Sequence, residues 1–381
     1  MADIDSINNV EVTSISKVGN TETTNISEIN GVDYPIIGAT RWLIGASGGR
    51  LYMNDSPPGM FLSASASGAI GLVVDKGSMN FYGVAYGNDE NSQPRWIAHS
   101  DDVSNDIFYI SASQDPNTSG NWTKVNVSNG KTAKRGGPGI TFGNGKWFAV
   151  GGGRNLGGNN RLLMMSSSDG GNSWEEVNQA SLIGTSNNGY AVNYVSASAW
   201  WSPMGVTKFY QTTNARTWAS ASGEISGYEA YAMGYNKDQG THGRWIVGTN
   251  SGKLYYSDDN FATDPTEAVS PFGTSNVWGV IYAGGSINKW IAIASNGKIA
   301  YSTLGSAFTA STLPSPIGSS HHMRGIASDN LIAVVVGATN GGNNCILSSS
   351  NGTSWTYVSS LAMGNVNFES IACNIIGHPG N

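Results

Sequence analysis

Short runs of hydrophobic residues, most of them opened by tryptophan, recur along this chain. Typical copies are "RWLIG" from residue 41 and "KWIAIA" from residue 289. Short apolar runs bounded by glycine, asparagine and serine are typical of buried β-strands. Seven runs follow one another at steps of 41 to 54 residues, with these residues at the matching position: Trp42, Trp96, Trp147, Trp201, Trp245, Trp290 and Leu331. The pattern predicts seven copies of one β-sheet module.

Further short strands flank each tryptophan run, so each module contains four strands. One precedes it, as in "VWGVIYAG" from residue 277, and one follows it, as in "GKLYYSDD" from residue 252. The first module lacks its leading strand, and "NFESIACN" at residues 367–374 matches the missing type. A repeat of this length is that of a propeller blade. We therefore predict an all-β, seven-bladed β-propeller over residues 37–381, closed by the C-terminal strand, which leaves no free sheet edge at the junction.

The turn before the fourth strand has a recurring pattern of its own. Its full copy, "SSSDGGNSWEEV" at residues 166–177, has the spacing S-x-D-x-G-x-x-W at four positions: Ser167, Asp169, Gly171 and Trp174. Incomplete copies occupy residues 212–218, 256–263 and 349–355. An Asp or Asn side chain in such a turn accepts hydrogen bonds from the backbone of the turn itself. Because the pattern recurs at one place in the module, we interpret it as a structural staple, whose tryptophan packs between blades, rather than a catalytic or metal-binding loop.

The full copy of this turn resembles the Asp-box of the sialidase-type (BNR) β-propellers, a motif also found in photosystem II assembly factors and in many secreted proteins. The resemblance extends over residues 41–376, although only the turn at residues 166–177 matches all four motif positions. Because this family is functionally diverse, the resemblance implies a fold and not an activity.

A sialidase of this family has an arginine cluster that grips a carboxylate, the first arginine standing in an Arg-Ile-Pro context. None of the nine arginines of this chain precedes isoleucine, and Arg41, Arg95 and Arg244 precede repeat tryptophans, which marks them as repeat elements. A glycosidase needs two carboxylates facing one cleft. Glu175 and Glu176 instead are neighbours on an expected outer strand, where successive side chains point to opposite faces. We therefore expect no enzymatic activity and no cofactor.

Candidates for metal, phosphate or disulfide chemistry lack the required spacing. "SDDVSND" at residues 100–106 has three aspartates but no complete calcium-loop pattern, so a solvated turn is preferred over a calcium site. "GGGRNLGGNN" at residues 151–160 lacks the phosphate-loop lysine. Cys345 and Cys373 are expected to be buried thiols rather than a bridge. The histidines are expected to lie in surface loops: His99, His242, His321, His322 and His378.

Composition and charge narrow the class of partner. Charged residues make up only 12% of the chain, about half the usual share. The net charge is −6 and no run of lysine or arginine occurs, which argues against nucleic-acid binding because phosphate neutralisation supplies most of that affinity. The N-terminal "MADIDSINNVEV" is acidic where a signal peptide is basic, and no apolar run is long enough to cross a membrane. We expect a chain made in a cytoplasm, without a membrane partner.

Residues 1–36 form an arm with a different repeat. Three 11-residue units occupy residues 4–14, 15–25 and 26–36. Their apolar residues fall at matching positions: Ile4, Ile7, Ile15, Val18, Ile26 and Ile29. The arm has too little apolar area to fold alone, so we predict that it becomes ordered against a partner or against copies of itself. An unstructured linker is the alternative, but a linker has no reason to keep this register.

With its I-x-x-I-N-G-V units, the arm resembles the N-terminal segments of virion structural proteins from marine tailed phages, particularly those that infect cyanobacteria. This resemblance implies a non-enzymatic structural protein of a virion, in the tail, baseplate, a fibre appendage or the capsid decoration. The arm would bind other virion proteins, with a homo-oligomer in the particle left open, and the propeller would be displayed toward host-surface glycans. A free carbohydrate- or protein-binding propeller of a bacterium and a glycan-active enzyme are the alternatives. The arm favours the virion hypothesis over a free lectin, which needs no anchoring repeat.

Overall fold

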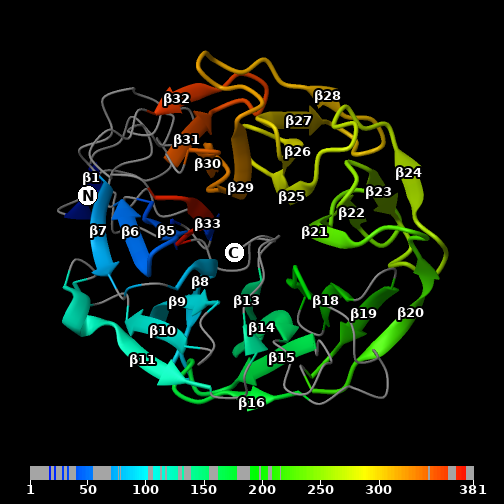
Figure 1. The fold of residues 1–381 in the computed structure, drawn as a ribbon. Helices are drawn as coiled ribbons and strands as arrows, with labels where there is room; N and C mark the ends of the chain where they lie inside the picture. The colour runs from blue at the N-terminus through cyan, green and yellow to red at the C-terminus, as the bar shows by residue number, and fades with distance from the viewer. Residues whose placement is uncertain are drawn as a thin grey trace.

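Seven antiparallel β-sheets surround a central axis in the computed structural model of this protein (Figure 1). The structure describes four residue pairs, 17–18, 21–22, 28–29 and 32–33, and then residues 40–54, 70–75, 77, 79–101, 106–111, 114–115, 118–127, 131–132, 139–153, 162–177, 189–196, 199–204, 208–214, 216–341, 344–358 and 366–374. No helix within these ranges is long and apolar enough to cross a membrane.

Each sheet is a blade with its innermost strand at the axis. Blade 1 consists of β33 (Phe368–Cys373), β5 (Trp42–Ala46), β6 (Arg50–Asn54) and β7 (Ile70–Asp75). Blade 2 consists of β8 (Phe81–Asn88), β9 (Pro94–Ser100), β10 (Asp106–Ser111) and β11 (Thr123–Asn126). Blade 3 consists of β13 (Ile140–Gly143), β14 (Lys146–Gly153), β15 (Leu162–Ser167) and β16 (Glu175–Glu176), with β12 (Lys131–Thr132) added to β14.

The remaining four blades follow in chain order. Blade 4 consists of β17 (Asn193–Ser196), β18 (Ala199–Met204), β19 (Lys208–Thr212) and β20 (Ala219–Glu224). Blade 5 consists of β21 (Ala230–Asn236), β22 (Arg244–Thr249), β23 (Leu254–Ser257) and β24 (Thr266–Ala268). Blade 6 consists of β25 (Val277–Ala283), β26 (Lys289–Ala294), β27 (Lys298–Ser302) and β28 (Thr309–Ala310). Blade 7 consists of β29 (His321–Ser328), β30 (Ala333–Thr339), β31 (Asn344–Ser349) and β32 (Thr356–Val358).

The C-terminal strand closes the ring, which confirms the predicted seven-bladed architecture. β33 pairs antiparallel with β5, with Cys373 opposite Trp42. The junction continues beyond the strands, because the Arg41 N–H donates to Asn374 Oδ1 at 2.9 Å and the Asn374 N–H donates to the Arg41 carbonyl at 3.1 Å. Ser370 Oγ also donates to the Phe81 carbonyl of blade 2 at 2.9 Å. The two ends of the propeller are therefore joined within one sheet.

The core of the described residues consists of hydrophobic clusters that each join two neighbouring blades. Trp290 of blade 6, for example, packs with Ile246 of blade 5, and Trp147 of blade 3 packs with Ile97 of blade 2. The repeat tryptophan thus faces the preceding blade and stabilises the ring by burying its large indole. Cys345 and Cys373 lie in these clusters as buried thiols that are not joined in a disulfide, as the sequence predicted.

Blade 4 departs from the predicted tryptophan register by one residue. In blades 3 and 5 the repeat tryptophan lies opposite the serine that begins the turn, as Trp147 does opposite Ser167. The matching turn residue of blade 4, Thr212, lies opposite Trp200 and not Trp201. A shift of one residue moves a strand side chain to the other face of the sheet. Trp201 accordingly packs toward the following blade, 5.7 Å from the Trp245 ring centroid.

Blade 7 departs from the predicted register by two residues. Ser349 lies opposite Ala333, so alanine and not Leu331 occupies the tryptophan position. Leu331 lies in the turn before β30 and is 47% exposed. The prediction for Leu331 was wrong because the apolar run begins in the turn, two residues before β30 begins at Ala333.

Two of the histidines expected in surface loops are buried in strands. His99 in β9 has no exposed surface, and neither of its ring nitrogens has a hydrogen-bond partner among the described residues. His321 in β29 is also buried, while His322 on the same strand lies 2.6 Å from Asn340 Oδ1. His242 is exposed in a turn, and His378 lies outside the described residues.

His99 gives the protein a defined sensitivity to acid. Burial lowers the pKa of His99 from 6.5 to about 4, so the unfolded chain takes up its proton at a higher pH than the folded chain. Stability is therefore lost as the pH falls from 6.5 toward 4, by about 3 kcal/mol over that range. Urea unfolding of His99→Leu should lose this part of the pH dependence. The exposed-site control His242→Leu should keep the slope of the unchanged protein, and equal slopes in both variants would contradict the assignment.

The described part of the arm consists of two very short hairpins. β1 (Lys17–Val18) pairs with β2 (Thr21–Glu22), and β3 (Glu28–Ile29) pairs with β4 (Val32–Asp33). Their residue numbers differ by 11, which is the length of the sequence unit. The expected anchoring residues Ile4, Ile7, Ile15 and Ile26 lie outside the described residues.

Candidate binding site at the central channel

Five of the described inner strands carry a β-bulge at the same place. In β8, β21, β25, β29 and β33 the pairing with the next strand skips one residue. A bulge takes the extra residue out of the ladder and redirects its side chain. The skipped residues are all aromatic or charged: Tyr82, Tyr231, Trp278, Arg324 and Glu369.

A small residue follows each bulged one, because the blades approach most closely at the axis. A Cβ atom at Gly279 would lie 2.8 Å from Ile326 Cγ2 of blade 7, and one at Gly325 would lie 3.0 Å from Ser370 Cα of blade 1. A side chain at either position would force the neighbouring atoms to move. The bulge and the small residue therefore act together, one placing a large side chain at the channel and the other letting the sheets meet behind it.

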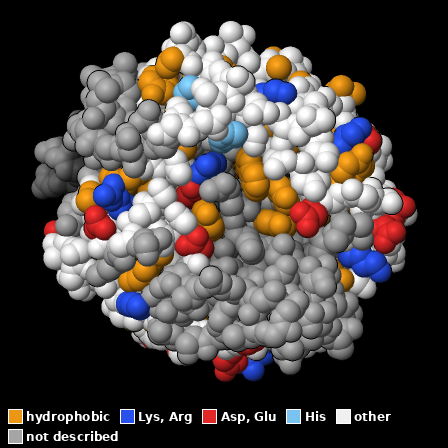
Figure 2. Space-filling model, viewed as in Figure 1, with side chains coloured by type: hydrophobic (Ala, Val, Ile, Leu, Met, Phe, Trp, Pro, Cys, Tyr) orange, Lys and Arg blue, Asp and Glu red, His pale blue; other side chains and the backbone are white. Residues whose placement is uncertain are grey.

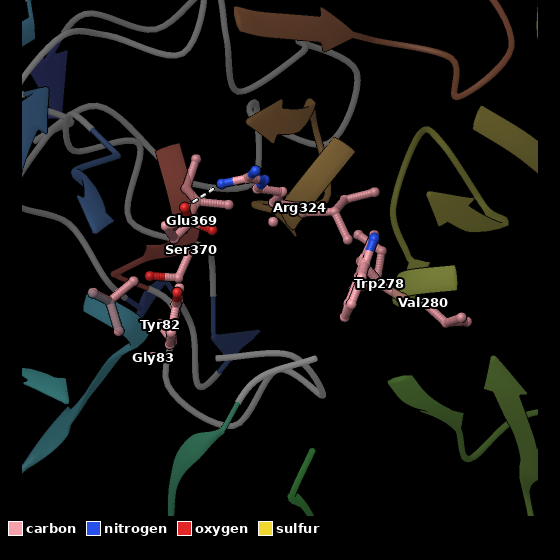
Figure 3. A pocket seen from close by; sticks show the side chains of 13 residues that line it. Tyr82, Gly83, Trp278, Val280, Arg324, Glu369 and Ser370 are labelled. Atoms are coloured by element: carbon pink, nitrogen blue, oxygen red, sulfur yellow. Dashed lines mark hydrogen bonds and ion pairs between the residues drawn. The ribbon is translucent and has the colours of Figure 1, made fainter. Parts of the chain in front are cut away.

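Four of the bulged residues line a cavity at the channel. Tyr82, Trp278, Arg324 and Glu369 surround about 390 Å³ of space, including the part open to solvent. Trp278 lies across the opening from Tyr82 and Glu369 (Figure 3). Hydrophobic side chains and charged ones of both signs gather around the hollow in the middle of this face, and the other visible basic side chains are scattered (Figure 2).

An ion pair joins blades 7 and 1 at this cavity. The Arg324 guanidinium contacts Glu369, and their side chains are only 10% and 1% exposed (Figure 3). Removing one partner of a buried pair leaves an uncompensated charge, which costs about 3–5 kcal/mol. The pair is neutral as a whole, yet it brings guanidinium donors and carboxylate acceptors to the wall of the cavity.

An aromatic arc continues the channel wall through blades 6, 5 and 4. The Trp278 ring stacks on Tyr231 with centroids 4.8 Å apart and planes at 13°, and Tyr231 contacts Tyr190 at 4.4 Å. Trp278 Nε1 donates to Ser295 Oγ at 2.8 Å, so the indole is held at its face and at its nitrogen. Burial, followed by the neighbouring Tyr190 and Glu229, raises the pKa of Tyr231, which keeps its hydroxyl protonated.

The turn at residues 166–177 lies on the outer part of blade 3, and its side chains bond one another. Ser167 Oγ donates to Asp169 Oδ1 at 2.7 Å and accepts the Gly171 N–H at 2.9 Å. Asp169 Oδ1 also accepts the Ser173 N–H at 2.9 Å, and Trp174 Nε1 donates to the Gly171 carbonyl at 3.1 Å. Partial burial alone would raise the pKa of Asp169, but the hydrogen bonds from Ser173 and Ser167 outweigh it and lower that pKa.

The basic residue before the repeat tryptophan links this turn to the preceding blade. Arg95 of blade 2 donates to the Gly170 carbonyl at 3.0 Å, and Lys146 of blade 3 donates to the Asn214 carbonyl in the turn of blade 4 at 3.1 Å. Arg244 of blade 5 donates likewise to the Leu304 carbonyl of blade 6. These cations therefore bind backbone oxygens of the next blade, and they do not gather at the channel.

Loss of the Asp169 carboxylate should weaken the propeller without affecting its channel. Asp169→Ala leaves the Ser173 N–H and two hydroxyls without their acceptor, which should lower the free energy of unfolding by about 1–3 kcal/mol. Urea unfolding compared with the exposed control Asp238→Ala measures the difference. A folded Asp169→Ala protein with unchanged stability but no binding activity would show that the turn is a functional site instead.

The other candidate groups do not converge on a site. Glu175 is exposed and pairs with Arg216 at 2.5 Å. Both carboxylate oxygens of Asp101 bond to Asn80, and the rest of the acidic segment up to residue 105 lies outside the described residues. Within the part of the chain that the structure describes, no group of three His, Cys, Asp or Glu side chains could hold a metal ion. The glycine-rich residues 154–160 are also outside it.

Comparison with known proteins gives a fold without a family. No protein-family model matches the chain, and no curated protein matches its sequence. Its structure is similar to YCF48 bound to a D1 peptide, with a TM-score of 0.52 and 12% identity over 78% of this chain and 91% of that one. It is also similar to YCF48 from Cyanidioschyzon merolae, with a TM-score of 0.51 and 9% identity over 78% of this chain and 95% of that one. These are likenesses of fold.

The channel residues Tyr82, Trp278, Arg324 and Glu369 are not among the site residues predicted from the sequence. Their signal was present as a large side chain followed by a small one in "FYG", "YAM", "VWG", "MRG" and "FES". In the sequence, these stretches indicate inner strands but no binding site. Ser167, Asp169, Gly171 and Trp174 are brought together in one turn, whereas the channel residues come from separate blades.

Proposed function

We propose that this chain is a non-enzymatic structural protein of a tailed-phage virion, in which the N-terminal arm anchors a displayed propeller. The observation that carries the proposal is the 11-residue period of the arm. The two described hairpins, β1–β2 and β3–β4, keep that period in their pairing, with Val18 opposite Thr21 and Ile29 opposite Val32. A plain linker has no reason to repeat either its sequence or its pairing.

The residue types between the paired strands support a repeated anchoring unit. Gly19–Asn20 stands between the strands of the first hairpin and Asn30–Gly31 between those of the second. Glycine and asparagine are the residues that two-residue hairpin turns favour. An isolated two-stranded hairpin is at best marginally stable in water, so such units gain stability by packing against another surface. Other virion proteins would provide that surface.

A protein-binding propeller outside a virion is the second candidate. The specific observation in its favour is that a YCF48 of similar fold was solved bound to a D1 peptide. The two proteins share 12% identity, so only the general capacity of this fold to present a peptide site carries over. A propeller that acts outside a virion has no need of an anchoring arm, and for that reason the virion assignment is preferred.

Sedimentation of particles tests the proposed function. Phage particles assembled in cells that produce the full chain should carry it through a density gradient, at a copy number that repeats between preparations. A chain found only at the top of the gradient would contradict the virion assignment. A parallel screen of the chain against oligosaccharides should give no hydrolysis product, and a turnover number above background would restore the glycan-active enzyme.

A further inference from the structure

The channel wall has the construction of a binding site rather than of ordinary core. In each of five described inner strands a bulge removes one large residue from the pairing, and bulges are frequent next to functional sites, where they redirect a side chain. Four of them line one cavity: Tyr82, Trp278, Arg324 and Glu369. Ligand sites are typically concave, mostly apolar and equipped with a few fixed polar groups.

The aromatic part of the wall presents a fixed flat surface. Tyr231 covers one face of the Trp278 indole, and Ser295 accepts its N–H. Trp278 nevertheless lines the cavity, so its remaining face and edge are what it offers to a ligand. Tyr82 lies across the opening (Figure 3). Aromatic faces of this kind favour ligands that have apolar C–H faces of their own.

The polar part of the wall favours an uncharged ligand that both donates and accepts hydrogen bonds. Glu369 already neutralises Arg324, so a carboxylate or phosphate would gain little there and would compete with the buried glutamate. The net charge of −6 further disfavours anions. Hydroxyl groups, by contrast, both donate and accept, and thus match a wall that carries both kinds of group.

From these features we infer that the central channel binds an uncharged saccharide, with a sugar ring against Trp278 and Tyr82 and its hydroxyls toward Arg324 and Glu369. The inference rests on the proposed display of the propeller and deepens it by naming the ligand class and the side chains. The site lies at the axis, where blades 1, 2, 6 and 7 contribute to one cavity.

Binding of oligosaccharides to the full-length chain tests the site without any virion. The chain is applied to an array of neutral and sialylated oligosaccharides and, in parallel, to a panel of short peptides with free carboxyl ends. The best neutral oligosaccharide is then titrated by calorimetry. We expect binding to neutral saccharides that changes little between low and high salt. No binding, or binding only to sialylated glycans or to peptides, overturns the inference.

Variants on the two sides of the cavity locate the ligand. Trp278→Ala and Tyr82→Ala should each weaken binding about tenfold, as expected for the loss of one aromatic contact. Tyr301→Ala, on the third strand of blade 6, is the matched aromatic control and should bind as the unchanged chain does. Unchanged affinity in both cavity variants overturns the site. If Trp278→Ala melts early, Tyr82→Ala decides the matter, since the two residues lie on different blades.

The outcomes separate this inference from the proposed function. If the chain joins particles but does not bind saccharides, the saccharide site is contradicted and the virion role is not. If the chain binds saccharides but never joins particles, the saccharide site is supported and the virion role is contradicted.

Discussion

Deletion of residues 367–381 should abolish the cooperative unfolding transition of the propeller. The deletion removes β33, the innermost strand of blade 1. It thereby exposes the edge of β5, with which β33 pairs. Phe368, Ile371 and Cys373 are buried there in the cluster that joins blades 7 and 1. Burial of Phe368 and Ile371 contributes roughly 1.5–3 kcal/mol each, so their loss removes a large share of the stability of a typical domain. The exposed β5 edge should then favour aggregation.

Calorimetry with a shorter deletion distinguishes the loss of ring closure by β33 from the loss of C-terminal residues in general. Removal of residues 375–381 leaves β33 and Asn374 in place and should leave the melting transition unchanged. Sedimentation should show a monodisperse protein for this control and aggregates for the longer deletion. A chain without residues 367–381 that melts as the full protein does would show that β33 does not hold the ring together.

Deletion of residues 1–36 should have the opposite consequence, a stable propeller that no longer joins particles. Apart from the two arm hairpins, every described strand begins at or after Trp42, and closure is completed at Cys373, so the ring does not need the arm. The apolar arm residues Ile15 and Ile26 should instead dock on a partner, each burial contributing roughly 1.5–3 kcal/mol. We expect particle occupancy to fall to background at an unchanged melting temperature.

Point variants test whether the arm deletion acts through the loss of its apolar residues and not merely by shortening the chain. Changing Ile15 and Ile26 to Asp should reproduce the deletion, because a charge at a docked apolar position must be desolvated. Changing Ser14 and Asn25, which directly precede these residues, to Asp adds the same charge outside the apolar register and should leave assembly intact. Full occupancy of the arm-less chain would place the anchor on the propeller.

The fold was predictable because its signal repeats. A single tryptophan run such as "RWIVG" at residue 244 says little, but seven runs at blade spacing predict seven sheets, and the unmatched "NFESIACN" predicts the closing strand. Register was less predictable than architecture. The sequence pattern predicts Trp201 and Leu331 at the repeat tryptophan position of blades 4 and 7. Strand pairing places Trp200 and Ala333 there instead. A chain position is visible in sequence, but the face on which its side chain lies depends on register.

The channel was not predicted because its residues differ in chemistry from blade to blade. Tyr231, Trp278, Arg324 and Glu369 share a bulge and not a residue type, and bulges have no sequence pattern as regular as strand alternation. His99 was misplaced for a related reason. A histidine is more often exposed than fully buried, and only the packing of β9 shows which case applies.

Cross-linking of amines in purified particles, followed by mass spectrometry, tests most directly whether the arm anchors a displayed propeller. Lys17 is the one lysine of the arm, while Lys124, Lys208 and Lys237 are exposed on the propeller. The proposed arrangement predicts cross-links from Lys17 to other virion proteins and, from the propeller lysines, cross-links only within this chain. Cross-links from the propeller lysines to virion proteins, with none from Lys17, would contradict it.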